Sequence, residues 1–536
     1  MFRITFRDAA LAITCTGVAL LLASPALAQL TDVTQTTPNV PGGAIGKSLQ
    51  EQVGTGQGDE FTPGSSIYLI KRDPARSIRR GRQLFQRKFT ANQGVGPRVN
   101  FDASGNIRTN RALGAGLVDS CAGCHGRPRG SAGFGGDVVT RPDSRDAPHL
   151  FGLGLKEMLA DEMTSELRAT RAVAIQSAQQ QGHSVTLNLY AKGIYFGRIK
   201  GLPDGTSDDS QIEGVNANLR VLPFFFEGGT ASMREFAIGA FKAEMGLESP
   251  DPVLCAVTDP VNPTAQTSPS GFHYDPALDT FERPPVCDAN ADGDGDGIVN
   301  EIDTALVDHM EFYLLNYFKA GLDRQTFRTQ QGKSLLHQIG CTECHVQNLT
   351  IDHDRRVADV ETVYDPQNGI FNRLFATAST LFTQVNDGQE FPKLLPTGNS
   401  FTVRNIYTDF KRHDLGETYW EREYDGTLQK EFLTTPLWGV GTTAPYGHDG
   451  RSITIRNAIL RHGGEASWSR NNFAYLSDSN QRKILEFLGT LVLFPPDDTA
   501  SNLNPGNPGG GLIQDPAVHG SINLGALFQI AAEGPE

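Results

Sequence analysis

The clearest helical pattern in the chain lies near its C-terminus. Four apolar residues there have the i, i+3, i+4, i+7 spacing of one helix face: Ile484, Phe487, Leu488 and Leu491. Residues 477–480 offer N-cap side chains before them, and Pro495 and Pro496 cannot continue a helix. We therefore predict a helix that closes a domain at this point.

Other stretches divide into helical and irregular ones. Residues 228–246 and 307–320 have helical apolar spacing. Residues 250–285 are rich in Pro, Thr, Ser and Asp, which predicts a loop. We also expect irregular structure at both ends, in the Gly-, Thr-, Gln- and Pro-rich residues 29–65 and in the Gly-, Pro- and Asn-rich residues 497–536.

One helical segment occurs twice, around Gly81 and around Gly332, and each copy leads into a Cys-x-x-Cys-His motif. The second motif begins nine residues after its glycine, whereas the first begins forty residues after. We interpret this pattern as an internal repeat with a long insertion in the first copy. It predicts two tandem domains, residues 66–320 and residues 321–496.

The N-terminus predicts export. Two arginines within the first seven residues precede a largely apolar run, and an Ala-x-Ala cleavage signal ends at residue 28. We therefore expect residues 1–28 to be a signal peptide. The apolar run is short for a membrane span and no later segment is apolar enough, so we expect a periplasmic or secreted protein without stable membrane insertion.

The composition limits the number of domains and the kinds of partner that we expect. The 536 residues suffice for two to four domains, and 38% hydrophobic with 20% charged residues is ordinary for a globular protein. The formal net charge of -14 argues against nucleic acid as a partner, because phosphate binding needs a basic surface.

The cysteines point to a cofactor. Six remain once Cys15 has left with the signal peptide. Four of them stand in the two motifs, which consist of Cys121, Cys124 and His125 and of Cys341, Cys344 and His345. In such a motif the two thiols add to the vinyl groups of one haem and the histidine binds its iron. A redox-active cysteine pair and a zinc site are the alternatives, but neither requires a histidine after the second cysteine in both copies.

We therefore expect two covalently bound haem c groups, with His125 and His345 as iron ligands. The last two cysteines are Cys255 and Cys287. In an oxidising compartment we expect them to form a structural disulfide.

An acidic stretch between the predicted haem motifs matches the D-x-D-x-D-G-x5-[DE] pattern of a calcium loop. Its expected ligands are Asp292, Asp294, Asp296, the carbonyl of Ile298, and Asp303. The twelfth position is Asp instead of Glu, which shortens its bidentate reach. A solvated acidic loop is the alternative to a Ca²⁺ site.

Four motifs carry a family resemblance. They are Ala-Pro-His-Leu-Phe-Gly-Leu-Gly at 147–154, Thr-Pro-Leu-Trp-Gly-Val-Gly at 435–441, Ala-Pro-Tyr-Gly-His-Asp-Gly-Arg at 444–451 and His-Gly-Gly-Glu-Ala at 462–466. Their order resembles the bacterial di-haem cytochrome c peroxidase and MauG superfamily, in particular its di-haem oxidoreductase (thiol-oxidoreductase-like) branch. We expect a mainly α protein of two tandem cytochrome c-like domains with long insertions and irregular loops.

The resemblance implies a second ligand for the second haem. In the peroxidases a methionine fourteen residues after the histidine of the H-[DS]-G motif binds the C-terminal haem, and MauG has tyrosine there. Here His462 lies fourteen residues after His448. This implies a His345/His462 haem, with a lower potential than a His/Met haem. His448 is the alternative ligand, and a surface position for His462 stays open.

The N-terminal half departs from the peroxidases. Their F-W-D-G-R-A-x-S-L-E-E-Q stretch aligns without gaps on residues 225–236. Phe226 replaces the tryptophan between the haems, and Phe236 replaces the distal glutamine and leaves an apolar face. The distal glutamate corresponds to Glu244 after a two-residue gap, where it would serve in acid–base chemistry; a solvated helix residue is the alternative.

These features imply an exported di-haem c-type cytochrome oxidoreductase that is peroxidase-like. The first haem would react with peroxide or O₂, with Glu244 and Phe236 on its distal side. The second would relay electrons from a small redox donor protein or mediator. A di-haem oxygenase that uses O₂ on an apolar substrate and a non-catalytic electron-transfer cytochrome are the alternatives. We expect a monomer or a homodimer.

Overall fold

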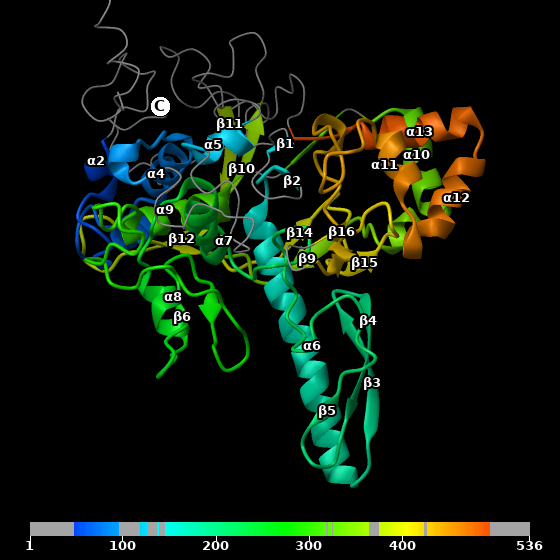
Figure 1. Ribbon diagram of the computed structural model, residues 1–536, viewed down its shortest axis with the longest axis horizontal. Coiled ribbons are helices and arrows are strands. Elements are labelled where there is room, and N and C mark those ends of the chain that lie inside the picture. The colour runs from blue at the N-terminus through cyan, green and yellow to red at the C-terminus, as the bar shows by residue number, and fades with distance from the viewer. Residues whose placement is uncertain are drawn as a thin grey trace, which may run out of the picture.

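The computed structural model describes most of the chain between residues 48 and 493 (Figure 1). The described ranges are 48–95, 118–126, 137–138, 145–317, 320–323, 325–363, 375–422 and 426–493. The predicted signal peptide and C-terminal tail lie outside them, as does most of the predicted N-terminal lead-in. Within these ranges no helix is both long enough and apolar enough to cross a membrane.

The first helix group contains α2 (Leu49–Val53), α3 (Ser66–Arg72), α4 (Pro74–Gln86) and α9 (Thr304–Asn316). Helix α4 starts at Pro74, which suits the first helical turn, and packs against α9, whose residues from Ala305 onward are all buried. Gly81 permits the close approach, because a Cβ there would lie 2.1 Å from the carbonyl oxygen of His309.

The second helix group contains α10 (Phe327–Gln338), α11 (Ile455–Arg461), α12 (Ser467–Tyr475) and α13 (Asp478–Leu488). Helix α10 packs against α13, and a Cβ on Gly332 would lie 1.9 Å from the carbonyl oxygen of Lys483. The helix predicted near the C-terminus is thus confirmed, but it ends at Leu488, and Leu491 lies beyond it in the strand β19 (Leu491–Val492). Its apolar face, with Phe473 and Leu336, forms a small second core.

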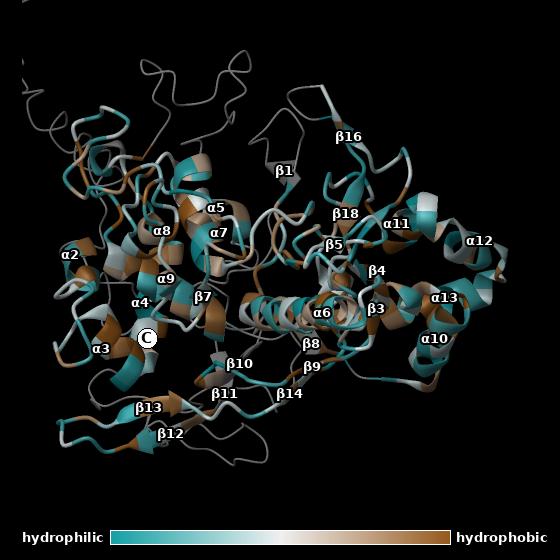
Figure 2. Cartoon of the chain, turned by 90° about the horizontal axis from the view of Figure 1, so that it is seen from below, coloured by the Kyte–Doolittle hydropathy of each residue, from teal (hydrophilic) through white to brown (hydrophobic). Residues whose placement is uncertain are grey.

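The two repeated glycines therefore have equivalent positions, each at the crossing of the helix before a Cys-x-x-Cys-His motif with a later helix. The two groups lie toward opposite ends of the molecule, as Figures 1 and 2 both show. A larger core, which includes α6 and α9, reaches into residues of the C-terminal half such as Phe410 and Trp438.

An arm extends from the body between the two groups (Figure 1). It consists of α6 (Leu153–Gln181) and an antiparallel sheet of β3 (Val185–Ala191), β4 (Ile194–Gly201) and β5 (Ser207–Asp208) in the order β3-β4-β5. The sheet packs along α6, and Gly201 permits contact with the backbone of Ala174. The sequence patterns had predicted no element here.

The other two predicted helical stretches are shorter than their apolar patterns. Helix α7 (Met233–Ala240) starts at its cap Ser232 and continues into the π-helical turn η3 (Phe241–Met245), and α9 ends at Asn316. Residues 250–285 are not all loop. They contain α8 (Pro252–Val257), capped by Asp251, and the strand pair β6 (Gln266–Thr267) and β7 (His273–Tyr274).

The remaining strands are short and pair antiparallel in twos. These pairs are β1 (Asp137–Val138) with β2 (Arg145–Asp146), β8 (Gly321–Leu322) with β19 (Leu491–Val492), β9 (Leu349–Ile351) with β14 (Phe401–Val403), β10 (Ala358–Val363) with β11 (Phe375–Thr380), β12 (Phe382–Val385) with β13 (Lys393–Pro396), β15 (Arg412–Asp414) with β18 (Glu431–Leu433), and β16 (Glu421–Arg422) with β17 (Leu428–Gln429). Single 3-10 turns are η2 (Ala91–Gln93), η5 (Val440–Thr442) and η6 (Gly464–Ala466).

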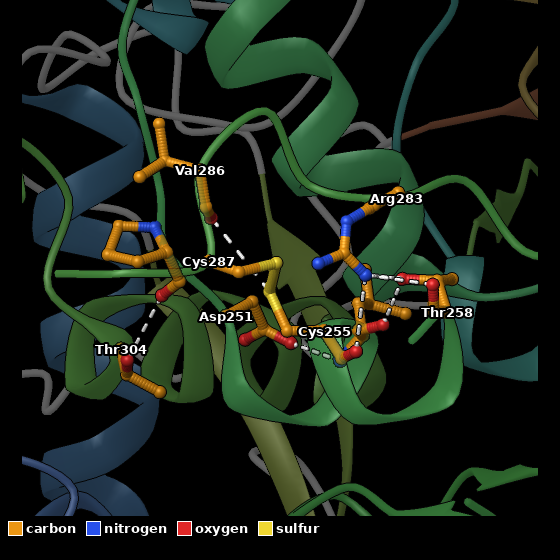
Figure 3. Close-up of a disulfide and its surroundings, with 9 residues drawn as sticks. Asp251, Cys255, Thr258, Arg283, Val286, Cys287 and Thr304 are labelled. Atoms are coloured by element: carbon orange, nitrogen blue, oxygen red, sulfur yellow. Dashed lines mark hydrogen bonds between the residues drawn. A yellow bond between two sulfur atoms is a disulfide. The ribbon is translucent and has the colours of Figure 1, made fainter. Parts of the chain in front are cut away.

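The expected disulfide is present. It joins Cys255 of α8 to Cys287, with the two Cα atoms 5.7 Å apart (Figure 3). The Arg283 guanidinium lies beside it and donates to the carbonyl oxygens of Cys255 at 3.5 Å and Thr258 at 2.8 Å. The bridge thus ties α8 to the segment that precedes the acidic loop.

Candidate haem sites

The first Cys-x-x-Cys-His motif forms the short helix α5 (Cys121–His125), which is capped by the hydroxyl of Ser120. The ring of His125 donates from Nδ1 to the carbonyl oxygen of Pro148 at 2.7 Å, since a carbonyl can only accept. Nε2 is therefore the ring nitrogen left for a metal. Burial lowers the pKa of His125 and so favours the neutral imidazole that metal binding requires.

The second motif begins in the 3-10 turn η4 (Cys341–Glu343) and repeats this arrangement. The ring of His345 donates from Nδ1 to the carbonyl oxygen of Tyr407 at 3.0 Å, and burial lowers the pKa of His345. Tyr407 and Pro148 stand in unrelated sequence contexts. Each motif thus obtains the same orientation of its histidine from a different segment.

His462, the predicted second ligand, has the same arrangement. It follows α11 as its C-cap, and its Nδ1 donates to the carbonyl oxygen of Ala458 at 2.7 Å. Burial lowers the pKa of His462 to about 4, which favours the neutral imidazole that metal binding requires.

His448, the alternative ligand, is 5% exposed and lies among aromatic rings. Its ring stacks on Phe432 with centroids 4.1 Å apart. The rings of Phe226 and Tyr419 each lie 6.0 Å from it, and Tyr419 in turn lies 5.5 Å from His462. Because Phe226 lines a cavity at the first motif, these contacts place His448 between that cavity and the predicted second haem.

The cavity at the first motif has a volume of about 1260 Å³. Cys121, Cys124 and His125 line it, and so do Phe224, Phe225, Phe226 and Phe236. Its volume exceeds the ~300–1,000 Å³ of ordinary small-molecule pockets. The C-terminal half contributes Leu433 and Trp438 to its wall, so residues from both halves of the chain line the cavity.

The two predicted catalytic residues meet in this cavity. Glu244 lies on the π-helical turn η3, a kind of helix irregularity that is frequent at functional sites. Glu244 and Cys124 both line the cavity, and burial together with the charge of Glu244 raises the pKa of the Cys124 thiol to about 11. The ring of Phe236 lies 5.3 Å from that of Phe225.

The acidic loop requires one correction. Two groups of carboxylates have oxygens within 4.8 Å of one another: Glu248, Asp292 and Asp294, and then Asp294, Asp296 and Glu301. Asp303 belongs to neither group, because it caps α9 by accepting from Ala305 N at 2.8 Å. Glu301, two residues earlier, and Glu248 belong to these groups instead.

Ile298, whose carbonyl was the expected backbone ligand, donates from its N–H to Asp296 Oδ1 at 2.6 Å. The sequence pattern missed Glu301 because an EF-hand loop has its last ligand at position twelve. It had no signal for Glu248, which comes from another segment and accepts from Gly293 N at 3.0 Å.

A further buried histidine, His413, lies beside the second motif. His413 binds Glu465 through Nδ1 at 2.7 Å and Asp409 through Nε2 at 2.9 Å, and Cys344 lies within 4.8 Å of it. Burial opposes protonation, but the hydrogen bond to Asp409 outweighs it, and the pKa of His413 rises to about 11. The carboxylates of Asp409 and Glu465 thus favour the protonated form of His413 next to the second motif.

Comparisons with known proteins give a family match for part of the C-terminal half of the chain. Residues 368–491 match the family model described as "Di-haem oxidoreductase, putative peroxidase". That segment contains His448 and His462 and begins after both Cys-x-x-Cys-His motifs. The curated proteins contain no match to the chain.

Two solved structures are similar in part. A hydrazine synthase from Kuenenia stuttgartiensis matches at 15% identity and a TM-score of 0.20, over 35% of this chain and 55% of that one. The chain thus spans about half the length of that relative. A MauG-like protein associated with microbial copper homeostasis matches at 11% identity and a TM-score of 0.24, over 72% of this chain and 96% of that one. At these TM-scores neither likeness bears on the fold. Residues 368–491 of this chain are thus similar to the di-haem oxidoreductase, putative peroxidase family.

Proposed function

We propose that this chain is an exported di-haem c-type cytochrome with peroxidase-like activity. The observation that carries the proposal is the shared geometry of the two motif histidines. His125 and His345 each donate from Nδ1 to a main-chain carbonyl, which orients the ring and leaves Nε2 to bind iron. Two motifs with this geometry in a di-haem oxidoreductase favour haem over a zinc site or a cysteine redox pair.

The residues around the first motif fit a covalent haem. The two thiols and the imidazole face one cavity, and seven phenylalanines give it the apolar walls that a porphyrin ring needs. When bound, the haem would supply the redox centre for the reduction of peroxide. Phe224 and Phe236 would exclude water from its distal side. Glu244 would hold or accept a proton there through a carboxylate oxygen.

The residues around the second motif fit a haem with two histidine ligands. His345 and His462 would bind its iron through Nε2, because Nδ1 of each ring is already engaged. The rings of Phe226, His448 and Tyr419 connect this site with the first cavity. We assign the second haem to electron relay from a small redox donor protein or mediator.

We assign the two haems to two cytochrome c-like domains, residues 66–320 and 321–496. The matching crossings of α4 with α9 and of α10 with α13 support this division. The α6 arm and the strand pairs are then insertions. The apolar N-terminal run supports export to the periplasm or the medium, and we expect a monomer or homodimer.

We also assign a structural Ca²⁺ to the acidic loop. Carboxylate oxygens are the ligands that Ca²⁺ prefers, and Asp292, Asp294 and Glu248 all border the first cavity. The ion would therefore bind at the wall of the reactive site. Asp294 belongs to both carboxylate groups and would be its central ligand.

The phenylalanine walls favour one second candidate, a di-haem oxygenase that uses O₂ on an apolar substrate. An apolar distal face suits an apolar substrate better than it suits peroxide, which needs polar partners. The two candidates differ in their oxidant. A stable O₂ adduct of the reduced first haem, with no response to peroxide, would select the oxygenase.

The decisive measurement is the visible and EPR spectrum of the purified ferric protein before and after addition of H₂O₂. We expect high-spin and low-spin haem together, and a rapid change on addition of peroxide. Two low-spin haems that ignore peroxide in every redox state would leave a non-catalytic electron carrier.

Variants separate the role of Glu244 from that of its surroundings. We expect Glu244→Gln to slow the reaction with peroxide by roughly 10²–10⁴-fold, the usual contribution of a general acid–base group. Glu227→Gln is the matched control, because Glu227 also lines the cavity. Equal rates for the two variants would exclude Glu244 as the proton-transfer group.

A further inference from the structure

The cavity beside the first motif contains a lysine that no acidic side chain balances. Lys156 lies in the first turn of α6 and lines the cavity, with Nζ 5.5 Å from the centroid of the Phe224 ring. Across the described ranges of the chain it has no hydrogen-bond or ion-pair partner. Burial alone lowers the pKa of Lys156 to about 8.

Its neighbours have other partners. Glu157 accepts from Arg355 at 2.6 Å and from the N–H of Met233 at 2.7 Å. His149 donates to a carbonyl oxygen and not to Lys156. Burial and the charge of Lys156 lower the pKa of His149. A partly buried ammonium without a counter-ion is costly, so its position in a cavity calls for an anionic ligand.

The shape of the site selects the kind of anion. One ammonium group on a flexible stem matches one carboxylate, whereas a phosphate dianion is usually held by several donors or by an arginine fork. The Phe224 ring lies beside Lys156, and Phe151 lines the same cavity. They suit the apolar body of a carboxylic acid.

We propose that Lys156 is the carboxylate-binding group of this cavity. The carboxylate belongs either to a propionate of the first haem or to an anionic substrate with an apolar body. Both sources have the same chemistry, a charge-assisted hydrogen bond from Nζ to a carboxylate oxygen. The inference rests on the proposed function, because it requires that the cavity hold the first haem.

The test uses the purified holoprotein and three variants. Lys156→Met keeps the length of the side chain without its charge, and Lys156→Arg restores the charge. Lys242→Met is the matched control, because Lys242 lines the same cavity but is exposed. Haem content is measured first, because a wild-type chain without two haems would refute the proposed function and not this inference.

Two readouts distinguish the sources of the carboxylate. If Lys156 binds a propionate, Lys156→Met lowers the midpoint potential of the first haem in the absence of any added ligand, and leaves the second haem unchanged. If Lys156 binds a substrate, the potentials stay unchanged. Sodium benzoate then perturbs the Soret band of the wild type, with an affinity that falls about tenfold or more in Lys156→Met.

Benzyl alcohol serves as the uncharged probe of the same shape, and we expect its affinity to be equal in all variants. Lys156→Arg should recover most of either effect, and Lys242→Met should show neither. The proposal is overturned if Lys156→Met changes neither the potential nor the affinity for benzoate. It is also overturned if Lys242→Met reproduces the change.

Discussion

The helix crossing at Gly332 offers a quantitative test of the second haem domain. A Cβ at this position would lie 1.9 Å from the carbonyl oxygen of Lys483 and 3.0 Å from Cβ of Phe487. Ordinary contacts start at 3.4 Å, so α10 and α13 would have to separate by about 1.5 Å. The carbonyl belongs to the backbone of a helix and cannot swing aside.

We expect Gly332→Ala to destabilise this domain despite its better helix propensity. Overpacking of a core costs about 1–3 kcal/mol, and alanine returns about 1 kcal/mol of helix propensity. The rigidity of the opposing backbone places the packing cost near its upper end, for a net loss of about 2 kcal/mol. Gly81→Ala, at 2.1 Å from the carbonyl oxygen of His309, should cost a similar amount in the first domain.

The control is Gly239→Ala in α7, where the nearest atom to a new Cβ is 3.9 Å away. We expect this change to stabilise the protein by about 0.4–1 kcal/mol. Urea unfolding followed by far-UV circular dichroism and by the Soret band gives the free energy for each variant. If Gly332→Ala proves as stable as Gly239→Ala, the close crossing of α10 and α13 is wrong.

Three further predictions concern single groups. His462→Met should raise the midpoint potential of the second haem, since a thioether stabilises ferric iron less than imidazole does; an unchanged potential in spectroelectrochemistry would remove His462 from the iron. Burial raises the pKa of Glu235 from its ordinary 4.5 to about 7. The folded state therefore keeps the proton to a higher pH than the unfolded state does. The free energy of unfolding should fall by up to about 3 kcal/mol as pH rises from 4.5 to 7. Glu235→Gln should lack this decrease when urea unfolding midpoints are measured across the same pH range. Replacement of Cys255 and Cys287 by serine opens a bridge between residues 32 apart and should cost about 3–4 kcal/mol by chain entropy, visible as a lower midpoint under non-reducing conditions.

Short-range sequence patterns predicted several parts of this architecture. The repeated glycine before each Cys-x-x-Cys-His motif predicted two equivalent units, and both glycines lie at a helix crossing. The spacing of Ile484 and its apolar neighbours predicted α13, because helix periodicity is a local property. The fourteen-residue spacing from His448 pointed to His462 as a candidate ligand. Its Nδ1 donates to a main-chain carbonyl, as Nδ1 does in both motif histidines.

Short-range sequence patterns gave wrong predictions where a side chain could serve in more than one structure. Asp303 satisfies the calcium pattern, but it is also a good N-cap for α9, and the helix uses it. Composition predicted a loop over residues 250–285, yet Asp251 followed by proline starts α8 there.

By itself the sequence determined features that depend only on neighbouring residues, such as the helix α13, and it predicted the two haem motifs and their repeat. Only the tertiary structure decided which distant groups meet. It brought Glu248 to the acidic loop, Tyr407 to His345, and Lys156 into the first cavity. Such pairings depend on how the halves of the chain pack against one another, and no short-range pattern records that.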